Sequence, residues 1–250
     1  MTARLDRELV ERGLARSRGQ AIDAIRDGRV QVNGQVATKG SSPTGPEDLI
    51  DVFRGDHYVS RAAHKLAGAL AGAGLTVPAR VLDAGASTGG FTQVLLEAGA
   101  HIVYAVDVGH GQLVPELRAD PRVVVREGLN LRDLTLEDVG GEPVDLIVGD
   151  VSFISLRMLL EPLFGVLSPT GSALLLVKPQ FEVGRKGLDS RGVVRDAARR
   201  TRAVADVAAA AAALGRRVAW QAESGLAGES GNVEYFLHLV PGTPGVASAS

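Results

Sequence analysis

The chain has 250 residues, a mass of 26.0 kDa and a formal net charge of −2, which is enough length for an α/β domain and a small accessory module. It has no cysteine, which excludes a disulfide framework and a thiol nucleophile, and its five histidines follow no metal-ligand spacing, so we expect no metal. Residues 1–14 are too charged for a secretory core, and no apolar run approaches the roughly 20 residues of a membrane span. We therefore expect a cytoplasmic protein without membrane contact. The oligomeric state stays open, with a monomer as the simplest case.

The sequence pattern of residues 1–55 predicts a small α+β module. Ser17 followed by Gln20 is a capping-box pattern, and apolar residues continue at helical spacing until Gly28. Two alternating strands then meet at Asn33-Gly34, the preferred dipeptide of a two-residue hairpin turn. A loop at 41–46, a returning strand at 49–52 and a linker at 56–59 complete this part of the chain.

Positive charge is concentrated in two segments. Residues 4–39 carry eight basic and five acidic residues, and residues 185–202 carry seven and two, giving +3 and +5. Such clusters are usually solvated faces, and the N-terminal module by itself could be a helical cap on a sheet. Two clusters that flank a nucleotide-binding domain favour a polyanionic partner instead. The candidate RNA contacts are Arg4, Arg7, Arg16, Arg18, Arg29, Phe153, Arg185 and Lys186, although Phe153 is also compatible with a core position.

Strands and helices alternate from residue 60 to residue 240. This pattern predicts an α/β domain in which a largely parallel sheet has helices on both faces. The end of the chain, 241–250, is small and polar, and we expect it to be disordered. The expected strands are 80–82, 101–106, 123–125, 144–148, 173–177, 218–221 and 233–239, and the expected helices are 61–73, 91–98, 155–164 and 195–214.

A glycine-rich turn follows the first of these strands and opens a helix. Its Gly-x-x-x-Gly-Gly spacing from Gly85 differs from the Gly-x-Gly-x-x-Gly of nicotinamide-binding domains and favours S-adenosylmethionine. Asp107, 24 positions after Asp83, ends the second strand, where it would accept from ribose hydroxyls. The alternatives to a cofactor site are a tight strand-to-helix connection, a helix cap at Ser87 and a turn at Asn130. The candidate cofactor residues are Asp83, Gly85, Ala86, Ser87, Thr88, Gly89, Gly90, Phe91, Asp107, Asn130 and Asp150.

Four charged residues are the catalytic candidates: Lys65, Asp150, Lys178 and Glu234. Asp150 and Lys178 follow the fourth and fifth strands, where open α/β sheets bind ligands, and Glu234 is predicted in the last strand. A ribose 2′-hydroxyl is a poor nucleophile, so its methylation requires a base or stabilisation of the alkoxide. We assign Lys178 to the hydroxyl, Lys65 as a second cation, Asp150 beside the methyl donor and Glu234 as the acid that orients a lysine. Which lysine takes the proton stays open.

Several segments of the chain resemble the TlyA family of ribosomal RNA 2′-O-methyltransferases, which are sometimes labelled hemolysin A. Residues 4–6 and 27–34 are similar to the RNA-binding module of ribosomal protein S4. The resemblance implies a Rossmann-like class I methyltransferase sheet of seven strands, a Lys-Asp-Lys-Glu tetrad, S-adenosylmethionine as methyl donor, cytidines of both rRNAs as targets and a link to capreomycin susceptibility. Ala62-Ala63 departs from an expected Gly-Gly, which puts the placement of Lys65 in question. The methyltransferase segments are 58–66, 83–91, 150–156, 178–182 and 231–237.

Other classes of protein share parts of this pattern. A pseudouridine synthase has no use for the glycine turn, and a dehydrogenase would have different glycine spacing. A membrane-active hemolysin requires an amphipathic or apolar segment, which is missing from the sequence. An S4-type RNA-binding protein without catalysis is the remaining alternative.

Overall fold

The computed structural model describes residues 3–15, 17–26, 29–52, 57–228 and 231–242. Arg16, Gly28, Asp56 of the predicted linker and the predicted tail from residue 243 lie outside the described residues. The chain divides into two compact units, Met1–Tyr58 and Val59–Ser250, and each has its own hydrophobic core.

The first unit packs helices against a small sheet. A core of buried apolar side chains, including Leu5, Leu9 and Ile25, joins the helices to the strands. Asn33 and Gly34 both have positive φ and connect two strands as the predicted hairpin, so that prediction is confirmed. The elements are β1 (Ala3–Arg4), α1 (Leu5–Glu11), α2 (Arg18–Arg26), β2 (Val30–Val32), β3 (Gln35–Val36), β4 (Pro43–Thr44) and β5 (Ile50–Val52).

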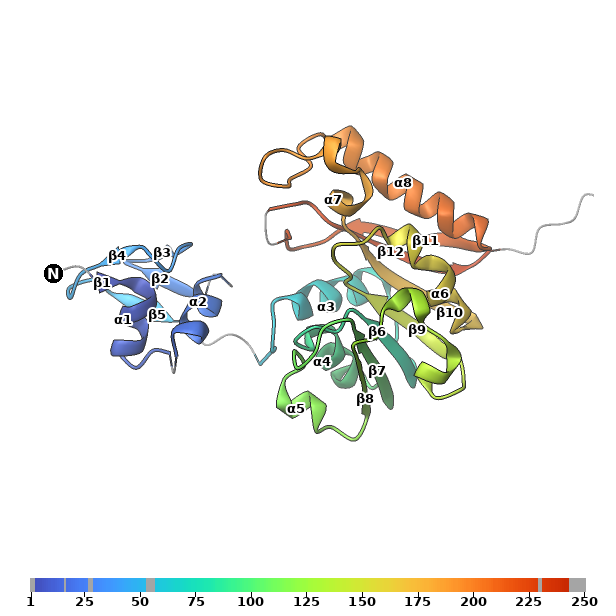
Figure 1. Ribbon diagram of the computed structural model, residues 1–250, viewed down its shortest axis with the longest axis horizontal. Helices are drawn as coiled ribbons and strands as arrows, with labels where there is room; N and C mark the ends of the chain where they lie inside the picture. The colour runs from blue at the N-terminus through green and yellow to red at the C-terminus, as the bar shows by residue number, and fades with distance from the viewer. Residues whose placement is uncertain (1–2, 16, 27–28, 53–56, 229–230, 243–250) are drawn as a thin grey trace, which may run out of the picture. The chain divides into compact units, whose positions relative to one another are not determined.

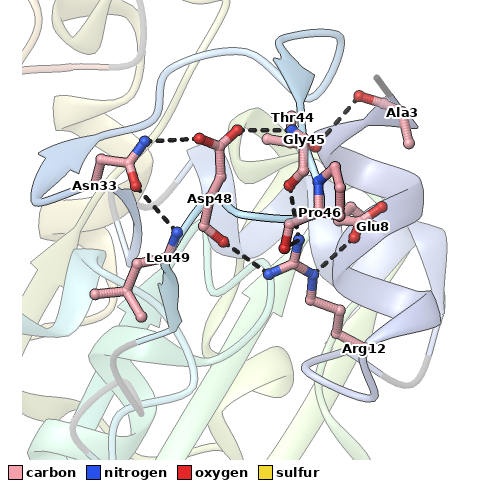
Figure 2. Close-up of polar contacts among 9 residues, drawn as sticks. All are labelled: Ala3, Glu8, Arg12, Asn33, Thr44, Gly45, Pro46, Asp48 and Leu49. Atoms are coloured by element: carbon pink, nitrogen blue, oxygen red, sulfur yellow. Dashed lines mark hydrogen bonds and ion pairs between the residues drawn. The ribbon is translucent and has the colours of Figure 1, made fainter. Parts of the chain in front are cut away.

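The segment predicted as a loop at 41–46 contains a strand. β4 pairs with β1 in an antiparallel bridge, and the Thr44 hydroxyl donates to the Ala3 carbonyl. Figure 2 shows the neighbouring loop, in which the Arg12 guanidinium donates to the carbonyls of Asp48, Gly45 and Pro46. These hydrogen bonds satisfy backbone carbonyl groups with donors from distant residues, which local sequence patterns do not reveal.

A buried carboxylate fixes the beginning of α1. Asp6 is completely buried and receives hydrogen bonds from Arg4 at 3.0 and 2.9 Å and from Arg18 at 3.1 and 2.9 Å. The hydrogen bond from Arg4, followed by that from Arg18, lowers the pKa of Asp6 to about 2 against the opposing effect of burial. Two of the arginines predicted to contact RNA therefore also hold the first unit together.

The second unit is built on a seven-stranded sheet with the order β11-β12-β10-β9-β6-β7-β8. Every neighbouring pair is parallel except the two pairs made by β12, which is antiparallel to β10 and to β11. The α/β class and the seven strands are confirmed. The strands are β6 (Arg80–Ala84), β7 (Ile102–Asp107), β8 (Val123–Glu127), β9 (Val144–Gly149), β10 (Leu167–Val177), β11 (Arg216–Glu223) and β12 (Tyr235–Pro241).

Helices cover both faces of this sheet, as predicted (Figure 1). α6 and α8 share one core with the strands through Leu160, Leu163, Val204 and Val207, while α3 and α4 pack on the opposite face. The helices are α3 (Ala62–Ala73), α4 (Gly90–Glu97), α5 (Pro115–Arg118), α6 (Leu160–Gly165), α7 (Pro179–Glu182) and α8 (Ala197–Ala213). The 3₁₀ turns that accompany them are η1 (Leu131–Asp133), η2 (Leu136–Val139), η3 (Leu156–Met158) and η4 (Arg185–Gly187).

Several boundaries differ from the prediction; β10, for example, begins at Leu167 instead of residue 173. The helix expected over 155–164 is split into η3 and α6, because Pro162 has no N–H to continue an α-helical ladder from η3. Glu234 precedes β12 instead of lying in it, and β12 extends to Pro241, the first residue of the predicted tail.

Candidate active site

The parallel strands end at one edge of the sheet, and the predicted residues follow them there. The glycine turn leaves β6 with Gly85 at φ 87°, a conformation that favours glycine. A Cβ on Gly85 would lie 3.1 Å from the carbonyl oxygen of Asp150, which follows β9. The turn and the end of the neighbouring strand are therefore in close backbone contact.

Gly90, at the start of α4, lies against the start of α3. A Cβ there would lie 3.1 Å from the Ala63 nitrogen and 3.4 Å from the Ala62 methyl group. Ala63 is fully buried in this contact. The two alanines that depart from the expected Gly-Gly are thus accommodated beside Gly90, and Lys65 still reaches its partner from the same helix.

Asp107 orders the glycine turn at the end of β7. Its carboxylate accepts from the Ser87 N–H at 2.8 Å and from the Gly109 N–H at 2.7 Å. Ser87 has a φ of 47°, and its hydroxyl donates to Gln112 at 3.1 Å. The two carboxylate oxygens have further lone pairs that these N–H groups do not use, and a ribose hydroxyl would donate to one of them.

Asp83 is a buried acid with one unpaired oxygen. Its Oδ2 accepts from Thr92 at 2.7 Å, whereas its Oδ1 is buried without a partner. Burial raises the pKa of Asp83 to about 7, the Thr92 hydrogen bond opposes this, and the neighbouring charges of Asp150 and Asp107 add to it. A buried orphan oxygen with a shifted pKa is typical of a ligand site.

Lys178 lies beside Asp150 where β10 and β9 end. Its Nζ is 2.6 Å from Asp150 Oδ1 as an ion pair, in an orientation that lacks hydrogen-bond geometry. The Nζ donates instead to the Ser152 hydroxyl at 2.7 Å. The Lys178 and Asp150 side chains are 11% and 16% exposed, so a substrate can reach this ion pair.

Lys65 and Glu234 form a second, more deeply buried pair. Lys65 Nζ donates to Glu234 Oε2 at 2.6 Å, and both side chains are buried. Val177 and Tyr235 are register partners in β10 and β12, so the next residues outward, Lys178 and Glu234, continue from adjacent strands. The structure therefore brings all four predicted residues to one end of the sheet.

Phe153 follows this group in an unusual conformation. It has a φ of 67° and is 92% exposed, and its ring contacts Phe181 with centroids 5.4 Å apart. Positive φ is rare for a bulky residue and is usually retained at functional sites. The core position considered from sequence is wrong for Phe153.

The remaining predicted residues fall into three groups. Ala86 and Phe91 are buried, and the Phe91 ring stacks on Phe236, so these two support the turn from beneath. Asn130 caps η1 by accepting from the Arg132 N–H, which is the turn alternative. The others lie at least partly exposed outside the four-residue group, apart from the buried backbone position Gly89: Thr88, Arg7, Arg29, Arg185 and Lys186.

Three polar residues of this site were missed by the sequence reasoning: Ser152, Glu182 and Thr92. Ser152 and Glu182 lie inside the segments 150–156 and 178–182, whose resemblance to the TlyA family was the available signal. Their hydrogen bonds to other loops depend on tertiary structure, which sequence spacing does not reveal.

Among the described residues, no group of three or more potential ligands is placed to hold a metal ion. The same residues contain no helix that is long and apolar enough to cross a membrane.

The model of FtsJ-like methyltransferases matches residues 58–240, and the model of the S4 domain matches residues 3–50. The chain belongs to the FtsJ-like methyltransferase family. One curated relative is the 16S/23S rRNA (cytidine-2′-O)-methyltransferase TlyA of Mycobacterium tuberculosis, which is 50% identical over 99% of this chain and 93% of its own length. Hemolysin A of Brachyspira hyodysenteriae is 39% identical over 95% of this chain and 99% of its length.

A solved structure of similar architecture is a putative hemolysin from Streptococcus thermophilus. It is 37% identical, covers 96% of this chain and 89% of its own, and superposes with a TM-score of 0.76. The resemblance to the TlyA family and the class I methyltransferase fold, with its seven-stranded mixed sheet, are confirmed. As a family member, the chain is a methyltransferase with an N-terminal S4 domain.

Proposed function

We propose that this protein transfers a methyl group from S-adenosylmethionine to the ribose 2′-hydroxyl of cytidine in small- and large-subunit ribosomal RNA. The observation that carries the proposal is the meeting of the Lys178–Asp150 and Lys65–Glu234 pairs at the carboxyl end of the sheet. The rRNA and cytidine specificity come from the names of the TlyA relatives. The S4 match supports an RNA substrate.

The residues beside the glycine turn fit S-adenosylmethionine. Gly85 and Gly89 have the positive φ that the tight turn requires, Asp107 offers acceptors for ribose hydroxyls, and Asp83 has an unpaired buried oxygen. When bound, the cofactor supplies a methyl group on a positively charged sulfur. The Asp150 carboxylate, beside Lys178, would stabilise the positive charge of that sulfur.

We assign Lys178 as the lysine nearest the substrate. It is more accessible than Lys65, and its Nζ lies between Asp150 and the exposed Ser152 hydroxyl. In the proposed reaction, Lys178 contacts the 2′-hydroxyl and stabilises the alkoxide that develops as the hydroxyl proton passes to water and the oxygen takes the methyl group. Lys65 is buried against Glu234, so this pair supports the site from beneath with its charge already balanced.

Phe153 and the basic residues would hold the RNA. An exposed aromatic ring beside the reacting group is suited to stack on a nucleobase displaced from its helix. Arg7 and Arg29 in the S4 domain, with Arg185 and Lys186 near α7, would contact phosphates without reading sequence.

Lys178→Ala tests this function directly. We expect the variant to lose methyl transfer to rRNA while its affinity for S-adenosylmethionine changes less than about twofold, because the lysine acts on the hydroxyl and not on the donor. Labelled-methyl transfer to purified ribosomal subunits, with mapping of 2′-O-methyl marks, measures the first quantity, and calorimetry measures the second.

Lys186→Ala is the matched control, because it removes a lysine that is proposed to bind RNA only. It should raise the RNA concentration needed for half-maximal rate and leave the maximal rate unchanged. Undiminished turnover by Lys178→Ala, or methylation at a base instead of a ribose, would overturn the proposal.

A further inference from the structure

A second carboxylate, outside the four-residue group, ties the two active-site loops together. Glu182 ends α7, the one-turn helix that begins immediately after Lys178, and its side chain is 2% exposed. It accepts from the Ser155 hydroxyl and the Leu156 N–H, both at 2.6 Å, and from Arg157 Nε at 3.1 Å. All three donors belong to the loop that follows β9.

The loop held in this way carries the reactive groups. It starts at Asp150 and includes Ser152 and the strained Phe153 before it reaches the donors to Glu182. The two loops touch at three successive places: Lys178 with Asp150 and Ser152, Phe181 with Phe153, and Glu182 with residues 155–157. Glu182 has the most deeply buried charged side chain of these contacts and accepts three hydrogen bonds, so it is the strongest constraint on how the loops meet.

The conformation of Phe153 requires such a constraint. A non-glycine residue in a positive-φ conformation costs roughly 1–3 kcal/mol and persists only when its surroundings impose it. Phe153 is 92% exposed, so its own side chain supplies little packing. Glu182 fixes the end of the loop through Ser155, two residues beyond Phe153, and the beginning is fixed where the Asp150 N–H donates to the Ala84 carbonyl.

We propose that Glu182 is a positioning residue for methyl transfer, which sets the register of the 150–157 loop against Lys178 and thereby places Asp150, Ser152 and Phe153. The inference rests on the proposed function, since Lys178 must be the group that acts on the hydroxyl. Glu182 itself touches neither substrate nor cofactor in this role.

Glu182→Gln is the test, because it keeps the size of the side chain and removes its charge. At saturating S-adenosylmethionine and RNA, we expect the maximal rate to fall roughly 10- to 100-fold, as is usual when reacting groups are displaced by about 1 Å. The affinity for S-adenosylmethionine should fall by a smaller factor than the maximal rate. Hydrogen exchange measured by mass spectrometry should accelerate in peptides covering 151–158 and stay unchanged in those covering β9.

Two further variants separate positioning from simple stabilisation. Asp138→Asn removes a carboxylate that accepts from Thr135 N–H and hydroxyl in η2, before β9 begins, and should lower thermal stability without lowering the maximal rate. Ser152→Ala combined with Glu182→Gln should reduce the rate by less than the product of the two single effects, because both act through the same Lys178 geometry.

The outcomes are distinct. If the protein without any substitution has no 2′-O-methyl transfer activity, the proposed function is refuted. An active protein in which Glu182→Gln lowers stability as Asp138→Asn does, but keeps its maximal rate, refutes the positioning role. Multiplicative effects of the Ser152 and Glu182 changes would also refute it.

Discussion

At the scale of single residues, the site is made of acids and lysines whose environments differ sharply. Lys65 and Glu234 are buried as a pair, and removal of one partner would leave an uncompensated charge, typically at a cost of about 3–5 kcal/mol. Lys178 and Asp150 remain accessible. In the proposed function, the same two kinds of charged group would support the site in one pair and act on the substrate in the other.

Asp83 gives a residue-scale prediction for pH. Its pKa is raised from 3.8 to about 7 in the folded protein, so between these values the unfolded chain has already lost the proton that the folded state retains. Stability should therefore fall by up to about 1.4 kcal/mol for each pH unit from 4 to 7, and level off above 7. Asp83→Asn removes this contribution, and denaturant titrations of both proteins at pH 4, 5.5, 7 and 8.5 measure it. A constant difference between them across that range would contradict the prediction.

At the scale of elements, the glycine turn must come close to the end of β9. Gly85 has positive φ, and a Cβ added to it would lie 3.1 Å from the backbone oxygen of Asp150, so a side chain there displaces one strand end from the other. Asp150 and the glycine turn are thus placed by one contact between neighbouring strands.

Gly85→Ala should lower both stability and catalysis. The left-handed conformation costs about 1–2 kcal/mol with a Cβ present, and the displaced Asp150 should reduce methyl transfer further. Gly141→Ala is the control, because Gly141 has a similar φ of 79° but has no atom within 4 Å of the added Cβ. We expect both variants to lose similar thermal stability, because both glycines have positive φ. Only Gly85→Ala should lower the rate of methyl transfer. Equal transfer rates in the two variants would show that the Asp150 contact is unimportant.

At the scale of the whole molecule, two units with separate cores share one chain. The stability of the first unit depends on the buried carboxylate of Asp6. Its pKa is lowered to about 2 by Arg4 and Arg18, so it contributes stability above its unfolded pKa, and that contribution is lost as the pH falls from about 4 to 2.

Asp6→Asn should therefore destabilise the first unit by about 2 kcal/mol at pH 7, with the difference disappearing by pH 2. In the full chain, calorimetry should show a lower first transition and an unchanged transition of the methyltransferase unit. Affinity for rRNA should fall while affinity for S-adenosylmethionine stays constant. A parallel shift of both transitions would show that the units unfold together.

Local signals in the sequence predicted most of the elements. Asn33-Gly34 specified the hairpin, and the alternation of apolar runs predicted the seven strands, because turn geometry and side-chain periodicity depend on near neighbours. The exceptions include β4, whose partner β1 lies about 40 residues away, the short helices α5 and α7, and the break between η3 and α6.

The sequence by itself determined the α/β class and the glycine turn, since residue type and spacing carry that information, and it singled out the four charged residues with the help of the resemblance to the TlyA family. Only the tertiary structure decided that the lysines separate into a buried and an accessible pair, that Phe153 is exposed in a strained conformation, and that Ser152 and Glu182 join the site. The burial, pKa and hydrogen-bond partners of a side chain depend on which distant segments pack around it. Neighbouring residues in the sequence do not determine these properties.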